Sequence, residues 1–227
     1  MGQIPPPVAT QAYNLRQGNE ADLDDITRIH IDGFAHEPMD DHCYPLRSIH
    51  KNDHFEWMRK EYEYYFENPR KYVVQVVDVP EQAEGVTRKI IALAVWNIAV
   101  LTKVPALDRG LDKRQDASKG RVEAYIKVAS RRYEPQGFFF DWAEKQITLS
   151  ALTVLPEFRR HGVGTMMVKW GIDFAAEKGW PVTVCASPLG RFLYAHLKFD
   201  VIGIEVIQAE GEEDSFSSTA MILLPEE

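Results

Sequence analysis

The chain has 227 residues, of which 45% are hydrophobic and 26% charged, and its formal net charge is -8. This composition is typical of a globular protein with a sizeable core, and the acidic balance argues mildly against a nucleic-acid binder, which usually has a strong basic excess. The chain starts with no signal-peptide run, and no apolar run reaches the roughly 18 residues of a membrane span. Cys43 and Cys185 form no CxxC pair, so we expect a soluble cytoplasmic protein with reduced thiols and no membrane partner.

The first part of the chain predicts a loose segment, a strand and then helices. Residues 1–12 are expected to be loose, and a strand is expected from Tyr13. Asn19 is placed to cap the helix that follows. The apolar residues of that helix roughly keep a helical period: Leu23, Ile26, Ile29 and Phe34.

Two prolines interrupt this pattern in residues 35–45, AHEPMDDHCYP, and predict a loop. A second helix, rich in aromatic residues, is expected over residues 49–68. The β-branched runs of residues 71–79 and 89–100 then predict two adjacent strands, joined by a polar link that contains Gly85.

A mixed-charge insert, residues 103–136, comes next. Part of it, residues 118–133, predicts a helix. The insert is long for a connection between strands, and long connections tend to be functional or disordered. The insert therefore marks a candidate functional region within one domain that spans residues 1–227.

The last third of the chain predicts alternating strands and helices. Residues 146–154 alternate as in a half-buried strand, and a helix follows in which four apolar residues share one face: Val163, Met167, Trp170 and Phe174. A short strand, a short helix and two closing strands are expected after it: residues 182–187, 189–199, 200–208 and 218–225.

The turn before the long helix predicts an anion site. Gly162 and Gly164 stand where the helical pattern begins, although glycine costs a helix roughly 0.5–1 kcal/mol relative to alanine. The first N–H groups of a helix lack intrahelical partners and carry the positive end of its dipole. Because the glycines have no Cβ and three basic residues precede them, Arg159, Arg160 and His161, we expect a phosphate or pyrophosphate there. The spacing is neither a P-loop nor a GxGxxG dinucleotide turn.

The string VLPEFRRHGVG, residues 154–164, resembles motif A of the GNAT (Gcn5-related) N-acyltransferases, which use acetyl-CoA. The stretch SPLGRFLYAHLKF resembles the family's later helix, with Tyr194 and Phe199 in register. Ser187, Gly190 and Lys198 depart from the residues that are common at their positions. The resemblance implies a mixed α/β fold: a central, twisted, mostly antiparallel sheet with splayed fourth and fifth strands, flanked by helices.

The resemblance also implies a site. The pantetheine arm of acetyl-CoA is expected along Leu152, Thr153 and Val154, and the pyrophosphate on the turn that follows. The residues implied to contact the coenzyme are Leu152, Thr153, Val154, Arg159, Arg160, His161, Gly162, Val163, Gly164, Thr165, Ser187 and Tyr194. Tyr194 is implied to protonate the departing thiolate as general acid, because a phenol with a pKa of about 10 stays protonated at neutral pH.

The general base is less defined, because the fourth strand carries Thr148 and Ser150 where many relatives have Glu or His. His36 and Glu37 are the base candidates, and Asp40 of the same segment is a further one. The histidines and acids of this segment match no zinc spacing, so no metal is expected. The insert is expected near the acceptor entrance.

The expected function is acetyl transfer to a primary amine of a small molecule, by direct attack in a ternary complex. Two alternatives remain within the resemblance: a protein or peptide acceptor, with a lysine or an N-terminus as the amine, and a catalytically silent CoA-binding module. A phosphate binder unrelated to the family is a further alternative. No nucleic-acid partner is expected, and a monomer and a homodimer are both compatible with the sequence.

Overall fold

A computed structural model describes residues 13–80 and 88–225. The prediction of a loose segment over residues 1–12 and the link around Gly85 lie outside this range. In the described part, no helix is long and apolar enough to cross a membrane.

The described strands form one seven-stranded sheet in the order β1-β2-β3-β4-β5-β7-β6. Their bounds are β1 Asn14–Gln17, β2 Tyr72–Pro80, β3 Arg88–Asn97, β4 Ile147–Val154, β5 Val182–Ala186, β6 Asp200–Gln208 and β7 Ser215–Leu223. Neighbouring strands run antiparallel except β4 and β5, which are parallel. This is the mixed, mostly antiparallel sheet that the resemblance implied.

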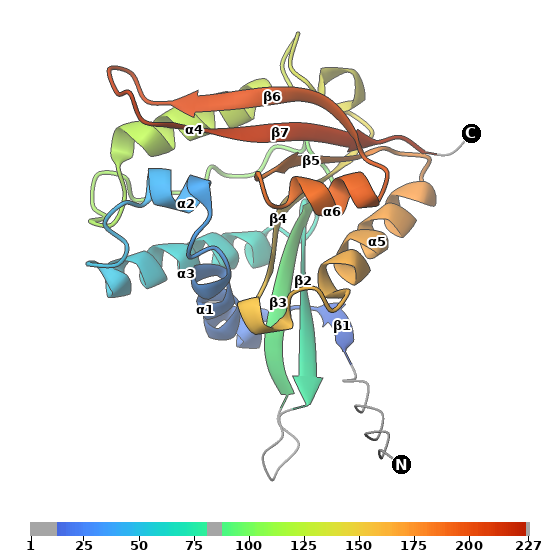
Figure 1. Ribbon diagram of the computed structural model, residues 1–227, viewed down its shortest axis with the longest axis horizontal. Helices are drawn as coiled ribbons and strands as arrows, with labels where there is room; N and C mark the ends of the chain where they lie inside the picture. The colour runs from blue at the N-terminus through green and yellow to red at the C-terminus, as the bar shows by residue number, and fades with distance from the viewer. Residues whose placement is uncertain (1–12, 81–87, 226–227) are drawn as a thin grey trace, which may run out of the picture.

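Helices flank the sheet (Figure 1). The α-helices are α1 Leu23–Gly33, α2 Pro38–Cys43, α3 Lys51–Glu67, α4 Lys119–Arg131, α5 Val163–Ala176 and α6 Arg191–His196. Short 3-10 helices lie at Glu20–Asp22, Phe140–Trp142 and Pro156–Phe158. Helices α1 and α3 pack on β2, β3 and β4, α5 packs on β3, β4 and β5, and α4 packs on β6.

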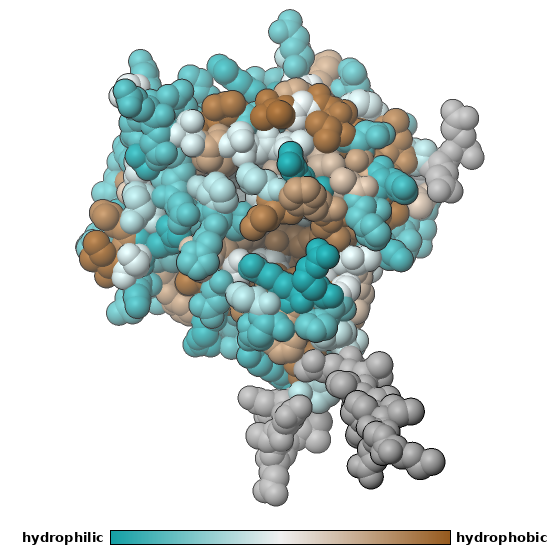
Figure 2. Space-filling model, in the orientation of Figure 1, coloured by the Kyte–Doolittle hydropathy of each residue, from teal (hydrophilic) through white to brown (hydrophobic). Residues whose placement is uncertain are grey.

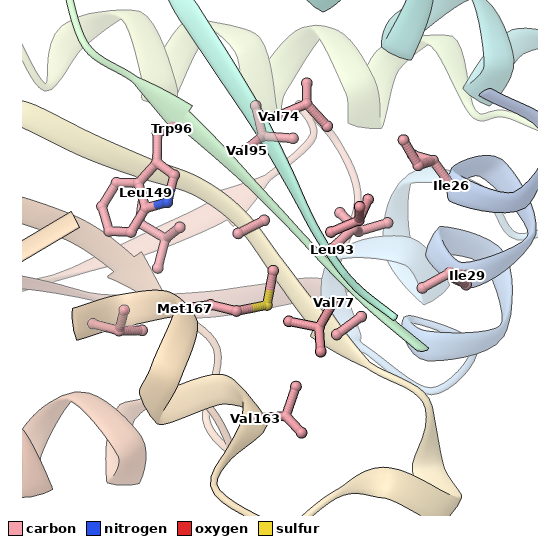
Figure 3. Packing of buried hydrophobic residues seen from close by; sticks show 14 of the residues in the cluster. Ile26, Ile29, Val74, Val77, Leu93, Val95, Trp96, Leu149, Val163 and Met167 are labelled. Carbon is pink, nitrogen blue, oxygen red and sulfur yellow. The ribbon is translucent and has the colours of Figure 1, made fainter. Parts of the chain in front are cut away.

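The core lies on both sides of β3, because helices cover both faces of this strand. Residues Ile90 to Trp96 of β3 are all buried. Figure 3 shows Ile26 and Ile29 of α1 facing Leu93, while Val163 and Met167 project from α5. At Gly171 of α5 a Cβ would lie 2.1 Å from the Trp96 ring, so the glycine lets α5 approach the sheet closely.

Local signals located most elements correctly. Asn19 caps the first helical turn as predicted: its side chain accepts a hydrogen bond from the Ala21 amide, and Asp22 completes a capping box. The prediction of a loop over residues 35–45 is wrong in its middle, where α2 forms. Pro38 occupies the start of α2, a position that tolerates proline because the first N–H of a helix has no partner.

Candidate functional site

Strands β4 and β5 separate after a short stretch of pairing. They are hydrogen-bonded partners only from Ile147↔Val182 to Leu149↔Val184. Beyond this point β4 pairs with β3 alone, and Ser150 falls at the register shift of that pairing. The second edge of β4, from Ala151 to Val154, therefore keeps main-chain N–H and C=O groups without a strand partner. These groups border a cavity of about 1460 Å³.

The cavity reaches the turn before α5. Arg160 and Gly162 both have positive φ, 66° and 82°, and Gly162 is the N-cap of α5. The first amide of the helix to bond back is that of Met166, to the carbonyl of Gly162 at 2.9 Å. The earlier N–H groups have no helical acceptor and sit at the positive end of the helix dipole. A Cβ at Gly162 would meet no atom within 4 Å, so the space beside this residue, where α5 begins, is open.

The Arg159 side chain forms hydrogen bonds to main-chain carbonyls that the sequence did not indicate. Its guanidinium donates to the carbonyl of Val154 at 2.9 Å and to that of Gly33 at 2.7 Å. At Gly33 a Cβ would lie 2.1 Å from Oγ1 of Thr153. The end of α1 is thus fastened closely to the end of β4, where both line the cavity.

We call the place where β4 and β5 separate the fork. Tyr194, Glu37 and Ser187 border the cavity beside it. Tyr194 is 5% exposed and packs on Phe199. Burial, with the nearby Glu37 charge, raises the pKa of the Tyr194 phenol well above its usual value. Burial also raises the pKa of the Glu37 carboxyl, and a hydrogen bond from Ser187 partly offsets that rise. Ser187 in addition accepts a bond from the Gly190 amide at 3.1 Å.

At the other end of the cavity the walls are mainly aromatic. We call this the tyrosine end, and the fork with the turn before α5 the turn end. The tyrosine end is lined by Tyr44, Tyr62, Tyr65, Tyr72, Tyr125 and Tyr133, together with Phe34 and Met58. Glu61 and Arg109 form an ion pair there, at 3.3 Å. Burial disfavours the Glu61 carboxylate, yet Arg109 and a bond from Tyr65 hold its pKa below the usual value.

The structure brings most of the predicted site residues to this one cavity. The predicted coenzyme residues that line it are Leu152, Thr153, Val154, Arg159, Arg160, Gly162, Val163, Gly164, Thr165, Ser187 and Tyr194. Glu37 and Asp40 line it too. His161 and His36 are exposed and are not among its lining residues. Insert residues such as Arg109, Tyr125 and Tyr133 also line the cavity.

Sequence reasoning missed His30 and Glu61, which line the cavity from α1 and α3 beside Tyr62. The helical pattern marked these helices as packing elements, and the only signal for a site was the density of tyrosines in α3. The described residues contain no group of three or more His, Cys, Asp or Glu side chains that could hold a metal ion.

The cavity lies open on the face drawn in Figure 2, which shows a hollow between α6 and the turn before α5. Apolar residues line its depth, and strongly hydrophilic residues stand at its rim. A long molecule with a polar end and a less polar arm fits such a shape. The turn amides suit a diphosphate, and the free edge of β4 suits an amide-bearing chain.

Comparisons with known proteins agree with this geometry. The Acetyltransferase (GNAT) family matches residues 108–187. A protein of Stachybotrys chartarum named "Acetyltransferase" is 23% identical, over 96% of this chain and 95% of its own length.

Solved structures share the fold at low identity. A mosquito arylalkylamine N-acetyltransferase (like 5b) has a TM-score of 0.62 at 14% identity and covers 94% of this chain and 100% of its own. A histone acetyltransferase HPA2 and related acetyltransferase from Corynebacterium glutamicum has 0.61 at 18%, covering 95% and 98%. Arabidopsis thaliana NAA60, in complex with acetyl-CoA, has 0.55 at 14%, covering 94% and 98%. The family match over residues 108–187, the named relative and the shared fold agree with one another, and they identify the protein as an acyltransferase that is similar to the GNAT acetyltransferases.

Proposed function

We propose that the protein transfers an acetyl group from acetyl-CoA to a primary amine of a small molecule. The observation that carries the proposal is the fork between β4 and β5, whose unpaired β4 edge leads directly to the open amides before α5. One chain segment thus offers strand-like pairing to the pantetheine arm and N–H groups to the diphosphate. Arg160 adds positive charge beside the turn. Arg159 acts by fastening α1 to β4.

The reaction needs a carbonyl activated by hydrogen bonding, a proton acceptor and a proton donor. A main-chain N–H of the free β4 edge near Val154 polarises the thioester carbonyl. Glu37 accepts the proton of the attacking amine, and its raised pKa places it nearer to neutral pH than an ordinary carboxylate. The C–N bond forms and the C–S bond breaks. Tyr194 then gives its proton to the departing thiolate, which leaves as the thiol.

Glu37 suits the role of base better than His36 for a geometric reason. Glu37 borders the cavity within electrostatic reach of Tyr194, whereas His36 is exposed and outside the lining. Cys185 also lines the cavity, but burial raises the pKa of its thiol to about 12. A thiol in that state is a poor nucleophile at neutral pH. Cys185 is therefore not proposed to form an acyl-enzyme, and the amine attacks the thioester directly.

The shape of the tyrosine end supports a small acceptor. It is walled by residues of α3, α4 and the segment before α4, and it lies deep, because Tyr44 and Tyr62 are 5% and 2% exposed. The named relatives include both an arylalkylamine and a histone enzyme, so an experiment must separate the acceptor classes. Thiol release from acetyl-CoA should be measured with small amines, polyamines, amino acids and lysine or N-terminal peptides. Turnover confined to peptides, or acetyl-CoA binding without thiol release for any acceptor, contradicts the proposal.

The role of Tyr194 is tested by Tyr194→Phe, which keeps the ring and its packing on Phe199. We expect kcat to fall by about a hundredfold, because general acid catalysis contributes on this order, with CoA affinity unchanged. Steady-state kinetics across pH and calorimetry with CoA measure both quantities. A variant whose kcat and pH profile match the wild type removes Tyr194 from the mechanism.

A further inference from the structure

Asp40 and His30 line the wall of the cavity, on α2 and α1. Asp40 is 2% exposed and His30 is 9% exposed. Polar side chains buried to this degree are nearly always hydrogen-bonded. Their bonding therefore indicates whether they serve the fold or a ligand.

The bonding of this pair is incomplete. His30 Nδ1 lies 2.8 Å from the Tyr62 hydroxyl, which fixes the ring. His30 Nε2 and Asp40 Oδ2 have no hydrogen-bond partner. The two side chains do not satisfy each other, because Nε2 lies 3.8 Å from the nearer carboxylate oxygen, Oδ1. Two buried polar atoms thus remain unmatched side by side on a cavity wall.

The Asp40 carboxylate also lacks a cation. Among the described residues its only ion-pair contact is His30. Arg47 reaches the main-chain carbonyl of Asp40 at 3.1 Å, and its ion pair is with Asp41. Burying a carboxylate without a positive partner is costly. A ligand that brings a positive charge and N–H donors meets both needs.

The other charged residues of the cavity indicate that the ligand carries no carboxylate at this wall. Arg109 is paired with Glu61, and Arg132 forms a two-point bond to Glu205 at 2.7 to 3.0 Å. These two arginines are therefore already paired with acids. The other lysine and arginine residues that line the cavity are Lys71 and Arg159, which donate to main-chain carbonyls, and Arg160, which lies at the turn end. Glu37 precedes Asp40 by three residues on the same segment, so a ligand carboxylate at this wall meets two like charges.

We propose that Asp40 and His30 bind the ammonium group of the acceptor, and that the acceptor is an amine with no carboxylate next to its nitrogen. The inference rests on the proposed function for the identity of the acceptor. One ammonium N–H points to Asp40 Oδ2 and another to Nε2 of His30, in the tautomer whose Nδ1–H is donated to the Tyr62 oxygen. The aromatic and sulfur-bearing side chains nearby, Phe34, Met39, Met58 and Tyr62, enclose the apolar body.

The test is calorimetry on the full chain saturated with CoA, which has no acetyl group to transfer. The probes are phenethylamine, phenylalanine, which adds only a carboxylate beside the nitrogen, and 2-phenylethanol, which lacks the charge. We expect the amine to bind at least about tenfold more tightly than either, because only the amine brings a positive charge and N–H donors without a carboxylate. Equal binding of phenylalanine, or of the alcohol, overturns the proposal.

Asp40→Asn should weaken the binding of phenethylamine by at least about tenfold and leave CoA affinity unchanged. The matched control is Asp41→Asn, the next residue of α2, whose side chain is 58% exposed and paired with Arg47. This control should bind phenethylamine as the wild type does. If Asp40→Asn binds the amine as tightly as the control, Asp40 is not the ammonium site.

A second variant covers the case in which Asp40→Asn misfolds. His30→Gln keeps a polar side chain but moves its acceptor atom, and it should also weaken phenethylamine while the melting temperature and CoA affinity hold. Unchanged amine affinity in a folded His30→Gln counts against the pair. These experiments measure equilibrium binding, so they separate the two proposals. If amine binding depends on Asp40 but no acceptor gives thiol release, the proposed reaction is wrong and the ammonium site stands. If acetyl transfer occurs and is unchanged in Asp40→Asn, the ammonium site is wrong and the proposed reaction stands.

Discussion

The turn end and the tyrosine end of the cavity are built in different ways. At the turn end, the walls come mainly from one continuous stretch, β4 and the turn into α5, and the groups offered to a ligand are largely main-chain amides. At the tyrosine end, side chains from α1, α2, α3 and α4 converge, and the offered groups are carboxylates, phenols and an imidazole. Main-chain groups at a turn tolerate many side chains, whereas a side-chain pocket changes with each substitution. The comparison teaches that the proposed coenzyme site and the proposed acceptor site can vary separately.

The largest expected effect is a loss of stability that should lower amine affinity at the tyrosine end and leave the turn end unaffected. In a buried network outside the cavity, Asp116 accepts bonds from His54 at 2.6 Å and from Arg114 at 2.6 and 2.7 Å, and this joins the insert to α3. Asp116→Asn leaves Arg114 without its partner and should lower the free energy of unfolding by about 3–5 kcal/mol. Urea unfolding measures the loss. Amine affinity should fall with it, while CoA affinity holds in the folded protein.

The same network predicts a dependence on pH. Burial disfavours the Asp116 carboxylate, but Arg114 and His54 outweigh burial and hold its pKa far below the ordinary range. A depressed pKa stabilises the fold above the unfolded value, about 3.9, and this contribution is lost as pH falls below it. The variant should therefore differ from the wild type most at neutral pH. Asp112→Asn, at a residue with an 81% exposed side chain, is the control and should stay within about 0.5 kcal/mol.

The next effect sharpens the comparison at the junction of the two ends. Glu37→Gln removes the proposed base and should lower kcat by about a hundredfold. In the wild type, kcat/KM should fall as pH drops through the raised pKa of Glu37, because the base is then protonated. The Gln variant should lose this limb of the profile and keep its affinity for CoA. An unaltered profile would assign the limb to another group.

The smallest effect addresses the turn end alone. Gly162→Asp places a negative charge at the amides that begin α5. It should weaken the binding of CoA by about 2 kcal/mol, which is about thirtyfold in affinity. Asp tolerates positive φ better than most residues, so the fold should survive. Gly179→Asp is the matched control, since Gly179 follows the other end of α5 with φ 63° and open space around it. Equal CoA affinity in the two variants, measured by calorimetry, would remove the turn from the site.

Local patterns predicted the elements better than their contacts. Strand β4, the turn and α5 follow from alternation, two glycines and one apolar helix face. The prediction of a loop over residues 35–45 failed at α2 because two prolines and several acids resemble a loop, although Pro38 and the acids also suit the first turn of a helix. Arg159 illustrates the remaining gap. Its place in the motif was visible, but its bond to Gly33 joins residues 126 positions apart.

By itself, the sequence predicted the turn end and the resemblance to the GNAT acetyltransferases, since the proposed anion site depends on consecutive residues whose backbone geometry follows from glycine and a helix start. Tertiary structure alone decided the tyrosine end. His30 meets Tyr62 across 32 positions, and His54 meets Asp116 across 62. No local periodicity encodes such pairs, because their meeting depends on how α1, α2, α3 and the insert pack around the fork of the sheet.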